Sequence, residues 1–199
     1  VIGGAPGMAG AALLAARAAL ASGAGRVFVS PLDAAVPPCD TQQPELMFRP
    51  QWWRGDAATL ARSTVVCGCG GGEAVRDTLP TLMARCPRLL LDADALNALA
   101  ADESLQHRLQ ARASRGQATV LSPHPLEAAR LLGVDTASVQ ADRLRAAVAH
   151  GHLRLRVGAQ PRQSAVAAHF ALALHEAVRV VDRERHQRRR LVARVAEHH

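Results

Sequence analysis

Short apolar runs alternate with longer segments of helical composition along the first three quarters of the chain. The runs are too short for helices and are typical of strands buried in a sheet. They occupy residues 1–2, 26–30, 44–48, 64–67, 89–91 and 118–121. Helices are predicted between and after them at residues 11–21, 73–84, 95–100, 104–115, 126–132 and 137–149. This order predicts an α/β fold, a doubly wound parallel sheet with helices on both faces.

Two carboxylates, Asp92 and Asp94, directly follow the apolar run at 89–91, and Asn97 lies one turn further along. Ligands of an open parallel sheet bind outside the carboxyl ends of its strands. A carboxylate pair there can hold Mg²⁺, accept hydrogen bonds from a ribose, or cap the next helix. We expect these three side chains to be metal or ligand contacts, with helix capping as the alternative.

Glycine-rich segments follow two other predicted strands, at residues 3–10 and 68–72. Glycines at four of the five positions from 68 to 72 leave no side chains in the way of a flat or charged ligand. The alternative is a flexible turn. The first segment lacks the Walker-type phosphate loop and matches the Rossmann glycine pattern poorly.

His124 stands between Pro123 and Pro125 at the end of the predicted strand 118–121. The two prolines restrict the backbone and so fix the direction of the imidazole. A predicted strand of like direction precedes each of four candidate residues, Gly72, Asp92, Asp94 and His124. We therefore predict that these residues share one edge of the sheet.

The length of 199 residues suits one domain with a substantial core, or two small ones. No run of 18 apolar residues occurs, so no membrane span is predicted. The chain opens on Val1 without a signal-peptide pattern, as a piece of a longer protein would. The four cysteines form no paired Cys-x-x-Cys sets, which favours reduced thiols in the cytoplasm. Cys67-Gly68-Cys69 is only a weak zinc signal.

The net charge of +7 is concentrated in the last quarter of the chain. Residues 1–145 hold 14 Arg and 13 acidic residues, whereas residues 146–199 hold 10 Arg, 4 acidic residues and 7 of the 9 His; there is no Lys. Such a shift in composition marks a boundary. We therefore expect a core at 1–145 and an Arg/His-rich tail at 146–199 that is helical or disordered and loosely attached.

Five collinear motifs carry a resemblance to a known family. They are Gly3-Gly4-x-Pro6-Gly7-Met8-Ala9-Gly10-Ala11, Ser22-Gly23-Ala24-Gly25, Pro44-Glu45-Leu46-Met47, Asp92-Ala93-Asp94-Ala95-Leu96-Asn97 and Pro123-His124-Pro125-x-Glu127. In these motifs the chain resembles the ADP/ATP-dependent NAD(P)H-hydrate dehydratases, which are lyases with a ribokinase-like fold.

The resemblance implies repair of hydrated NADH and NADPH, with ADP or ATP and Mg²⁺, by phosphorylation of the hydroxyl and elimination of phosphate. It also implies that Ala18, Gly72 and His124 contact the hydrated dinucleotide.

The resemblance covers about residues 1–145, and the family's later motifs are absent. The chain has no Lys-Gly-x-Gly-Thr turn for the adenine nucleotide and no Gly-Ser/Thr-Gly-Asp helix start for phosphate and the catalytic base. Smaller departures are Gly68-Cys69-Gly70-Gly71-Gly72, where Gly-Pro-Gly-Leu-Gly is usual, and Leu126 in place of Gly. The catalytic residues therefore stay unknown.

We expect a ribokinase-like fold that is incomplete at its C-terminus, truncated or frameshifted, and weakly active or inactive. The alternatives are a non-catalytic dinucleotide-binding relative, or a basic module that uses residues 186–190 on nucleic acid. Neither nucleic acid nor a membrane is an expected partner. The sequence leaves room for a homo-oligomer.

Overall fold

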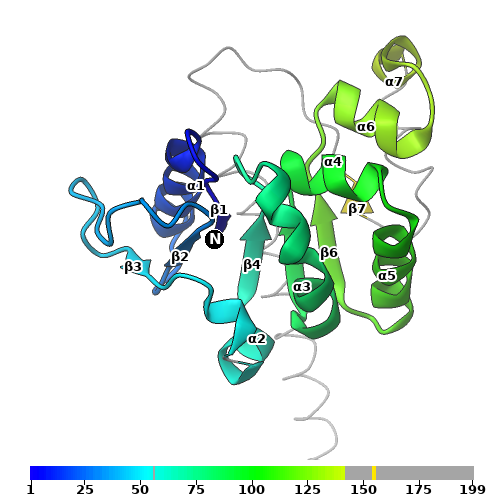
Figure 1. The fold of residues 1–199 in the computed structure, drawn as a ribbon. Coiled ribbons are helices and arrows are strands. Elements are labelled where there is room, and N and C mark those ends of the chain that lie inside the picture. Colours follow the sequence, from blue (N-terminus) through cyan, green and yellow to red (C-terminus); the bar gives the residue numbers. More distant parts are fainter. Residues whose placement is uncertain (56, 142–153, 156–199) are drawn as a thin grey trace, which may run out of the picture.

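The computed structural model describes residues 1–55, 57–141 and 154–155, and within them a single parallel sheet organises the chain (Figure 1). Its seven strands have the order β3-β2-β1-β4-β5-β6-β7, and every hydrogen-bonded pair is parallel. The strands are β1 (Ile2–Gly3), β2 (Phe28–Pro31), β3 (Met47–Phe48), β4 (Thr64–Cys67), β5 (Arg88–Leu91), β6 (Ala118–Leu121) and β7 (Arg154–Leu155). The structure thus confirms the predicted α/β class.

The helices largely match the segments predicted from composition. They are α1 (Ala9–Ala21), α2 (Ala57–Arg62), α3 (Leu79–Arg85), α4 (Asp94–Ala100), α5 (Glu103–Ser114), α6 (Pro125–Leu132) and α7 (Thr136–Ala141), with 3₁₀ turns η1 (Trp52–Arg54) and η2 (Glu73–Asp77). The single helix predicted at 73–84 is wrong, because the chain divides there into η2 and α3. Pro80 lies in the first turn of α3, where its missing N–H is tolerated.

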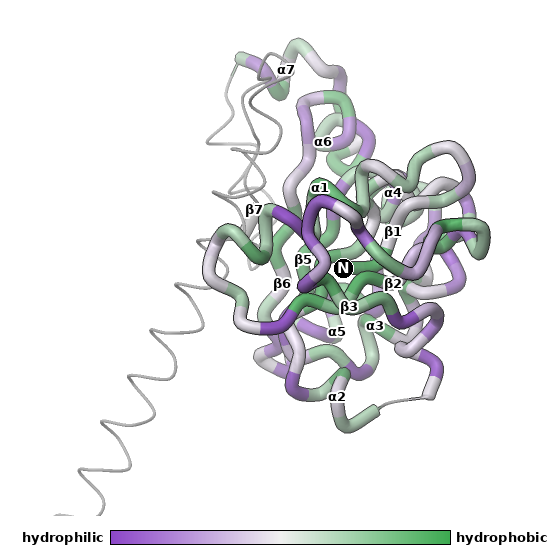
Figure 2. Tube along the Cα trace, turned by 90° about the vertical axis from the view of Figure 1, so that its left-hand side faces the viewer, coloured by the Kyte–Doolittle hydropathy of each residue, from purple (hydrophilic) through white to green (hydrophobic). Residues whose placement is uncertain are grey.

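Hydrophobic clusters cover both faces of the sheet, as expected of a doubly wound fold. Figure 2 shows the hydrophobic stretches of the chain, in green, gathered at the strands in the middle of the molecule. Leu89 and Leu91 pack on one face with α2 to α5, whereas Leu90 packs on the other face with α1. All three side chains are at most 2% exposed. Strand β5 is therefore buried on both sides, as its uninterrupted apolar run predicts.

The sequence beyond residue 145 contributes to the same sheet. Arg154 and Leu155 form β7 and pair with Val120 and Leu121 of β6. The expectation that residues 146–199 are helical or disordered is wrong for these two, because edge pairing with β6 holds them extended. The basic segment 186–190 and most of the tail lie outside the described residues, so the division at residue 145 stays a prediction.

None of the helices in the described ranges is long and apolar enough to cross a membrane.

Arg112 of α5 is fully buried. It links that helix to the sheet through hydrogen bonds to neutral acceptors. Its Nη1 donates to the carbonyls of Met83 (2.9 Å) and Cys86 (2.7 Å), and its Nε donates to Thr119 Oγ1 (2.8 Å). Burial lowers the pKa of Arg112 to about 10. The guanidinium thus ties the end of α3 to α5 and β6.

Replacing this guanidinium should destabilise the fold. Arg112→Met fills similar space but removes the side-chain donor to the Cys86 carbonyl and leaves the Met83 carbonyl only the longer hydrogen bond from Arg115 Nη2 (3.5 Å), so we expect the free energy of unfolding to fall by about 3 kcal/mol. Urea unfolding measures the change. Arg108→Ala, an exposed arginine on the same helix, is the control and should change stability by less than about 0.5 kcal/mol. Equal effects of the two substitutions would contradict the structural role of Arg112.

Candidate functional site

The loops that follow β1, β4, β5 and β6 converge at the carboxyl edge of the sheet (Figure 1). Gly72 follows β4, Asp92 and Asp94 follow β5, and His124 follows β6. These three strands are adjacent and parallel. The structure therefore brings the four predicted residues to one edge.

The glycine loop at 68–72 is held from both sides by backbone contacts. The N–H groups of Gly4 and Ala5 donate to the carbonyls of Cys69 (3.0 Å) and Gly70 (2.7 Å), and Asp94 N–H donates to Gly68 O (3.3 Å). Gly68 has φ +118°, and a Cβ there would lie 1.9 Å from the carbonyl oxygen of Asp92. The alternative of a flexible turn is therefore wrong, because backbone contacts with the loops that follow β1 and β5 hold this loop on both sides.

The two aspartates brace this loop. Asp94 Oδ2 accepts a hydrogen bond from Gly72 N–H (2.9 Å), and Asp92 Oδ1 accepts one from Ser122 Oγ (2.8 Å). Cys69 Sγ lies 3.6 Å from Asp92 Oδ2. Between them, Ala93 takes φ +47°, a strained value for a residue with a side chain, and begins α4 without a side-chain cap. Asp94 thus lies in the first turn of α4, and the pair connects the loops of β4, β5 and β6, while capping by Asp92 stays the alternative.

The described residues do not form a metal centre. No group of three His, Cys, Asp or Glu side chains within them could hold an ion. Asn97 Oδ1 accepts a hydrogen bond from Arg130 Nη1 (2.7 Å), so it ties α4 to α6. A metal role for Asp92, Asp94 and Asn97 stays a prediction.

His124 is both the N-cap of α6 and a half-exposed group at the edge. Its Nδ1 accepts from the N–H groups of Leu126 (3.2 Å) and Glu127 (3.4 Å), which assigns the ring proton to Nε2. That Nε2 lies 3.1 Å from Glu127 Oε1, while the His124 N–H donates to Glu127 Oε2 (2.9 Å). The capping box fixes the ring, and 51% of the side chain faces solvent.

Glu127 was not among the predicted site residues, although its spacing from His124 is that of a capping box. Its side chain is 6% exposed. Burial raises the pKa of Glu127 to about 7, the His124 N–H opposes this rise, and the negative charges of Asp92 and Asp94 add to it. Glu127 thus couples the orientation of His124 to the carboxylates of the neighbouring strand.

Ala18 lies apart from these residues. It is 8% exposed and packs in the core between α1 and the sheet. Helix α1 begins at Ala9, so Ala18 lies roughly 13 Å further along its axis. The structure does not bring Ala18 to Gly72 or His124, and its role as a ligand contact stays a prediction.

Comparison with known proteins matches most of the described fold to one family. The family model described as Carb_kinase, NAD(P)H-hydrate dehydratase, matches residues 1–152. The chain is 38% identical over 146 residues to the ADP-dependent (S)-NAD(P)H-hydrate dehydratase of Neisseria meningitidis serogroup B, covering 72% of this chain and 48% of that protein. It is 36% identical over 150 residues to the bifunctional NAD(P)H-hydrate repair enzyme Nnr of Escherichia coli K12, covering 74% and 27%. The chain thus spans half or less of the length of these relatives.

Solved structures show the same architecture. The ADP/ATP-dependent NAD(P)H-hydrate dehydratase of Bacillus subtilis, co-crystallised with ATP/Mg²⁺ and soaked with CoA, is similar with a TM-score of 0.59 and 26% identity. That match covers 79% of this chain and 57% of the other. A ribokinase-like superfamily protein of Enterococcus faecalis reaches a TM-score of 0.64 at 18% identity, covering 88% and 68%, and shows the fold alone.

The buried Glu127 makes stability depend on pH. Its pKa rises from 4.5 to about 7 on folding, so between these values the folded chain binds the proton more tightly than the unfolded chain does. The free energy of unfolding should therefore fall with rising pH, by about 2–3 kcal/mol through this group. Glu127→Gln should remove that part of the slope, since Gln does not titrate yet can complete a capping box.

Urea unfolding at pH 5 and pH 7.5 compares the slopes. Glu73→Gln is the matched control, because the Glu73 side chain is 88% exposed. It should keep the wild-type slope. A Glu127→Gln slope equal to that of wild type would show that the carboxyl titrates normally.

Proposed function

Because the chain belongs to the NAD(P)H-hydrate dehydratase family, we propose that its carboxyl-edge site binds hydrated NADH or NADPH as part of nicotinamide nucleotide repair. The observation that carries the proposal is the placement of Gly72 and His124 after β4 and β6, on either side of the aspartates that follow β5. They are two of the three residues, with Ala18, that the resemblance assigns to the hydrated dinucleotide.

The chemistry of the edge suits the nicotinamide and ribose end of such a ligand. The glycine loop offers backbone without side chains, and His124 offers a ring with a proton on Nε2 and half of its surface in solvent. The carboxylates of Asp92, Asp94 and Glu127 lie close enough to one another to perturb the pKa of Glu127. Carboxylates repel phosphates and accept hydrogen bonds from hydroxyls. We therefore assign the hydroxyl-bearing part of the ligand to this edge and the pyrophosphate to a position away from it.

The relatives' names point to ADP or ATP as the second substrate, and one relative was crystallised with ATP/Mg²⁺. We propose the same nucleotides, with Mg²⁺, for the complete reaction. In this chemistry most of the rate comes from donors around the phosphates and from a base beside the attacking hydroxyl. The 199 residues contain neither the Lys-Gly-x-Gly-Thr turn nor the Gly-Ser/Thr-Gly-Asp helix start that supply them in the family.

We therefore propose that this chain by itself binds the hydrated dinucleotide and dehydrates it slowly or not at all. A non-catalytic dinucleotide-binding relative is the second candidate, favoured by the same missing motifs. Both candidates place the protein in the cytoplasm, where reduced nicotinamide nucleotides occur and the free thiols of Cys67, Cys69 and Cys86 stay reduced.

Substitution of His124 tests the assigned contact. We expect His124→Asn to weaken the binding of hydrated NADH at least about tenfold, because the half-exposed imidazole ring that the resemblance assigns to the ligand is lost, and one ligand contact contributes about 1.4 kcal/mol. Asn can still cap α6, so the helix start is preserved. Isothermal titration calorimetry measures the affinity.

His107→Ala is the control for this substitution. His107 is exposed on α5 and lines a separate cavity beside Met83 and Ala84 at the end of α3, so its loss should leave the affinity unchanged. Unaltered affinity in His124→Asn would remove His124 from the site.

Turnover tests the second part of the proposal. The 199-residue chain is mixed with hydrated NADH, Mg²⁺ and either ADP or ATP, and recovery of the absorbance of the reduced nicotinamide is followed. We expect a rate at least about a thousandfold below that of the Bacillus subtilis dehydratase assayed in parallel, since the phosphate donors and the base are missing. Comparable rates would show that other residues of the tail supply them.

A further inference from the structure

Met8, directly ahead of α1, belongs to a turn that is fixed against the glycine loop at 68–72. The Met8 N–H donates to the carbonyl of Ala5 (2.8 Å), and the Met8 carbonyl accepts from the N–H of Ala11 (3.1 Å). Ala5 N–H in turn donates to Gly70 O (2.7 Å) and joins this turn to the loop. The backbone of Met8 therefore has a defined position beside the loop that follows β4.

The side chain of Met8 runs along the same loop. A Cβ at Gly70 would lie 2.9 Å from Met8 Cβ, and a Cβ at Gly72 would lie 3.3 Å from Met8 Cε. The thioether thus extends from Gly70 to Gly72, with its terminal methyl beside Gly72. Because Met8 is still 40% exposed, its outer surface is open to a ligand that reaches Gly72.

The two sides of the carboxyl edge differ in chemistry. The N–H of Gly72 is engaged by Asp94 Oδ2 (2.9 Å), so a ligand at this position meets the glycine Cα and the Met8 thioether, both apolar. After β6, the half-exposed ring of His124 and the carboxylate of Glu127 provide polar groups. A ligand between the two sides would therefore be held by an apolar contact on one of them and by polar contacts on the other.

We propose that Met8 is a further contact of the ligand, and that its thioether packs against the hydrated nicotinamide ring and turns the ring hydroxyl toward His124. This inference rests on the proposed function. Methionine suits the task, because an unbranched side chain with a polarisable sulfur adapts its shape to the surface that it covers. The resemblance includes Met8 in its first motif but assigns it no contact.

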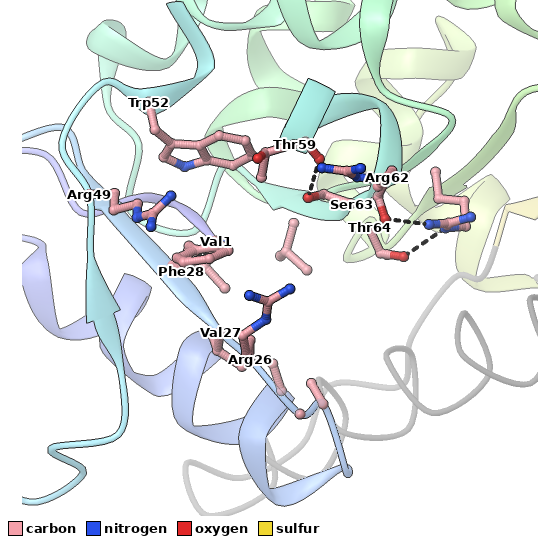
Figure 3. Close-up of a pocket in the computed structure, with 15 residues that line it drawn as sticks. Val1, Arg26, Val27, Phe28, Arg49, Trp52, Thr59, Arg62, Ser63 and Thr64 are labelled. Atoms are coloured by element: carbon pink, nitrogen blue, oxygen red, sulfur yellow. Dashed lines mark hydrogen bonds between the residues drawn. The ribbon is translucent and has the colours of Figure 1, made fainter. Parts of the chain in front are cut away.

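The two other methionines of the chain are internal controls for this contact. Met47 is 39% exposed, nearly as much as Met8, but it lies on β3 and pairs in register with Phe28 at the start of β2. Figure 3 shows this amino edge of the sheet, where Arg49 Cζ lies 4.5 Å from the centroid of the Phe28 ring. Met83 is fully buried on α3. The three methyl groups thus report separately on the proposed site, the opposite edge and the core.

Methyl NMR of the 199-residue chain, labelled with ¹³C-methyl methionine, tests the contact. Loss of one resonance in Met8→Leu assigns the Met8 methyl, and the labelled chain is titrated with hydrated NADH while calorimetry measures the affinity. We expect the Met8 methyl to shift saturably and to show a nuclear Overhauser effect to the protons of the hydrated ring. The methyls of Met47 and Met83 should stay in place. ADP-ribose, which lacks the nicotinamide ring, should leave all three unchanged at the same concentrations.

Substitutions of Met8 separate apolar packing from mere bulk. Met8→Gln keeps the length of the side chain but not its apolar surface, so hydrated NADH should bind at least about fivefold more weakly. Met8→Leu keeps the apolar volume and should bind within about twofold of the unaltered chain. Met47→Gln is the matched control and should leave the affinity unchanged.

Calorimetric binding of hydrated NADH without a shift of the Met8 methyl would overturn this inference and leave the proposed function standing. No binding to the unaltered chain would overturn both. Equal affinities of Met8→Gln and Met8→Leu would show that the apolar surface at this position does not hold the ligand. An equal shift with ADP-ribose would assign Met8 to the other half of the dinucleotide and contradict its packing against the ring.

Discussion

The close backbone approach at the glycine loop is the constraint on which the arrangement of the carboxyl edge depends. Parallel strands β1, β4 and β5 end side by side, so the loop at 68–72 must pass between the turns that follow its neighbours. A side chain at Gly68 would overlap the backbone at Asp92. With glycine there, Asp94 can accept the Gly72 N–H, and Asp92 can reach Ser122 ahead of His124. One steric condition thus sets the relative positions of the proposed ligand contacts.

The acidic groups at this edge hold the protein's own loops and side chains in position. Asp92 and Asp94 hold loops together, and Glu127 holds the ring of His124. Such positioning suits a site that must present a hydroxyl-bearing ligand in one orientation. The family model matches residues 1–152, and the two motifs that the resemblance assigns to the nucleotide and its phosphates are absent from the chain.

Local sequence signals predicted the strands and their shared edge, but not the contacts between them. Apolar runs at 64–67 and 118–121 became β4 and β6 without change. The roles of Asp92 and Asp94 depend on partners 30 and 22 residues away, respectively, which no local pattern encodes. Strand β7 depends on edge pairing with β6, and the buried position of Ala18 depends on how α1 crosses the sheet. Tertiary packing therefore determines the roles of the two aspartates, the pairing of β7 and the burial of Ala18.

The central claim, that the carboxyl edge receives the hydrated dinucleotide, is tested most directly by titrating the ¹⁵N-labelled chain with hydrated NADH and following its amide resonances. The account predicts saturable shifts at Gly70 to Gly72, at Asp94 and at His124, where the loops converge. Resonances at the opposite, amino edge of the sheet, such as those of Phe28 and Arg62, should stay in place. Shifts confined to that amino edge, or none at any concentration, would contradict the account.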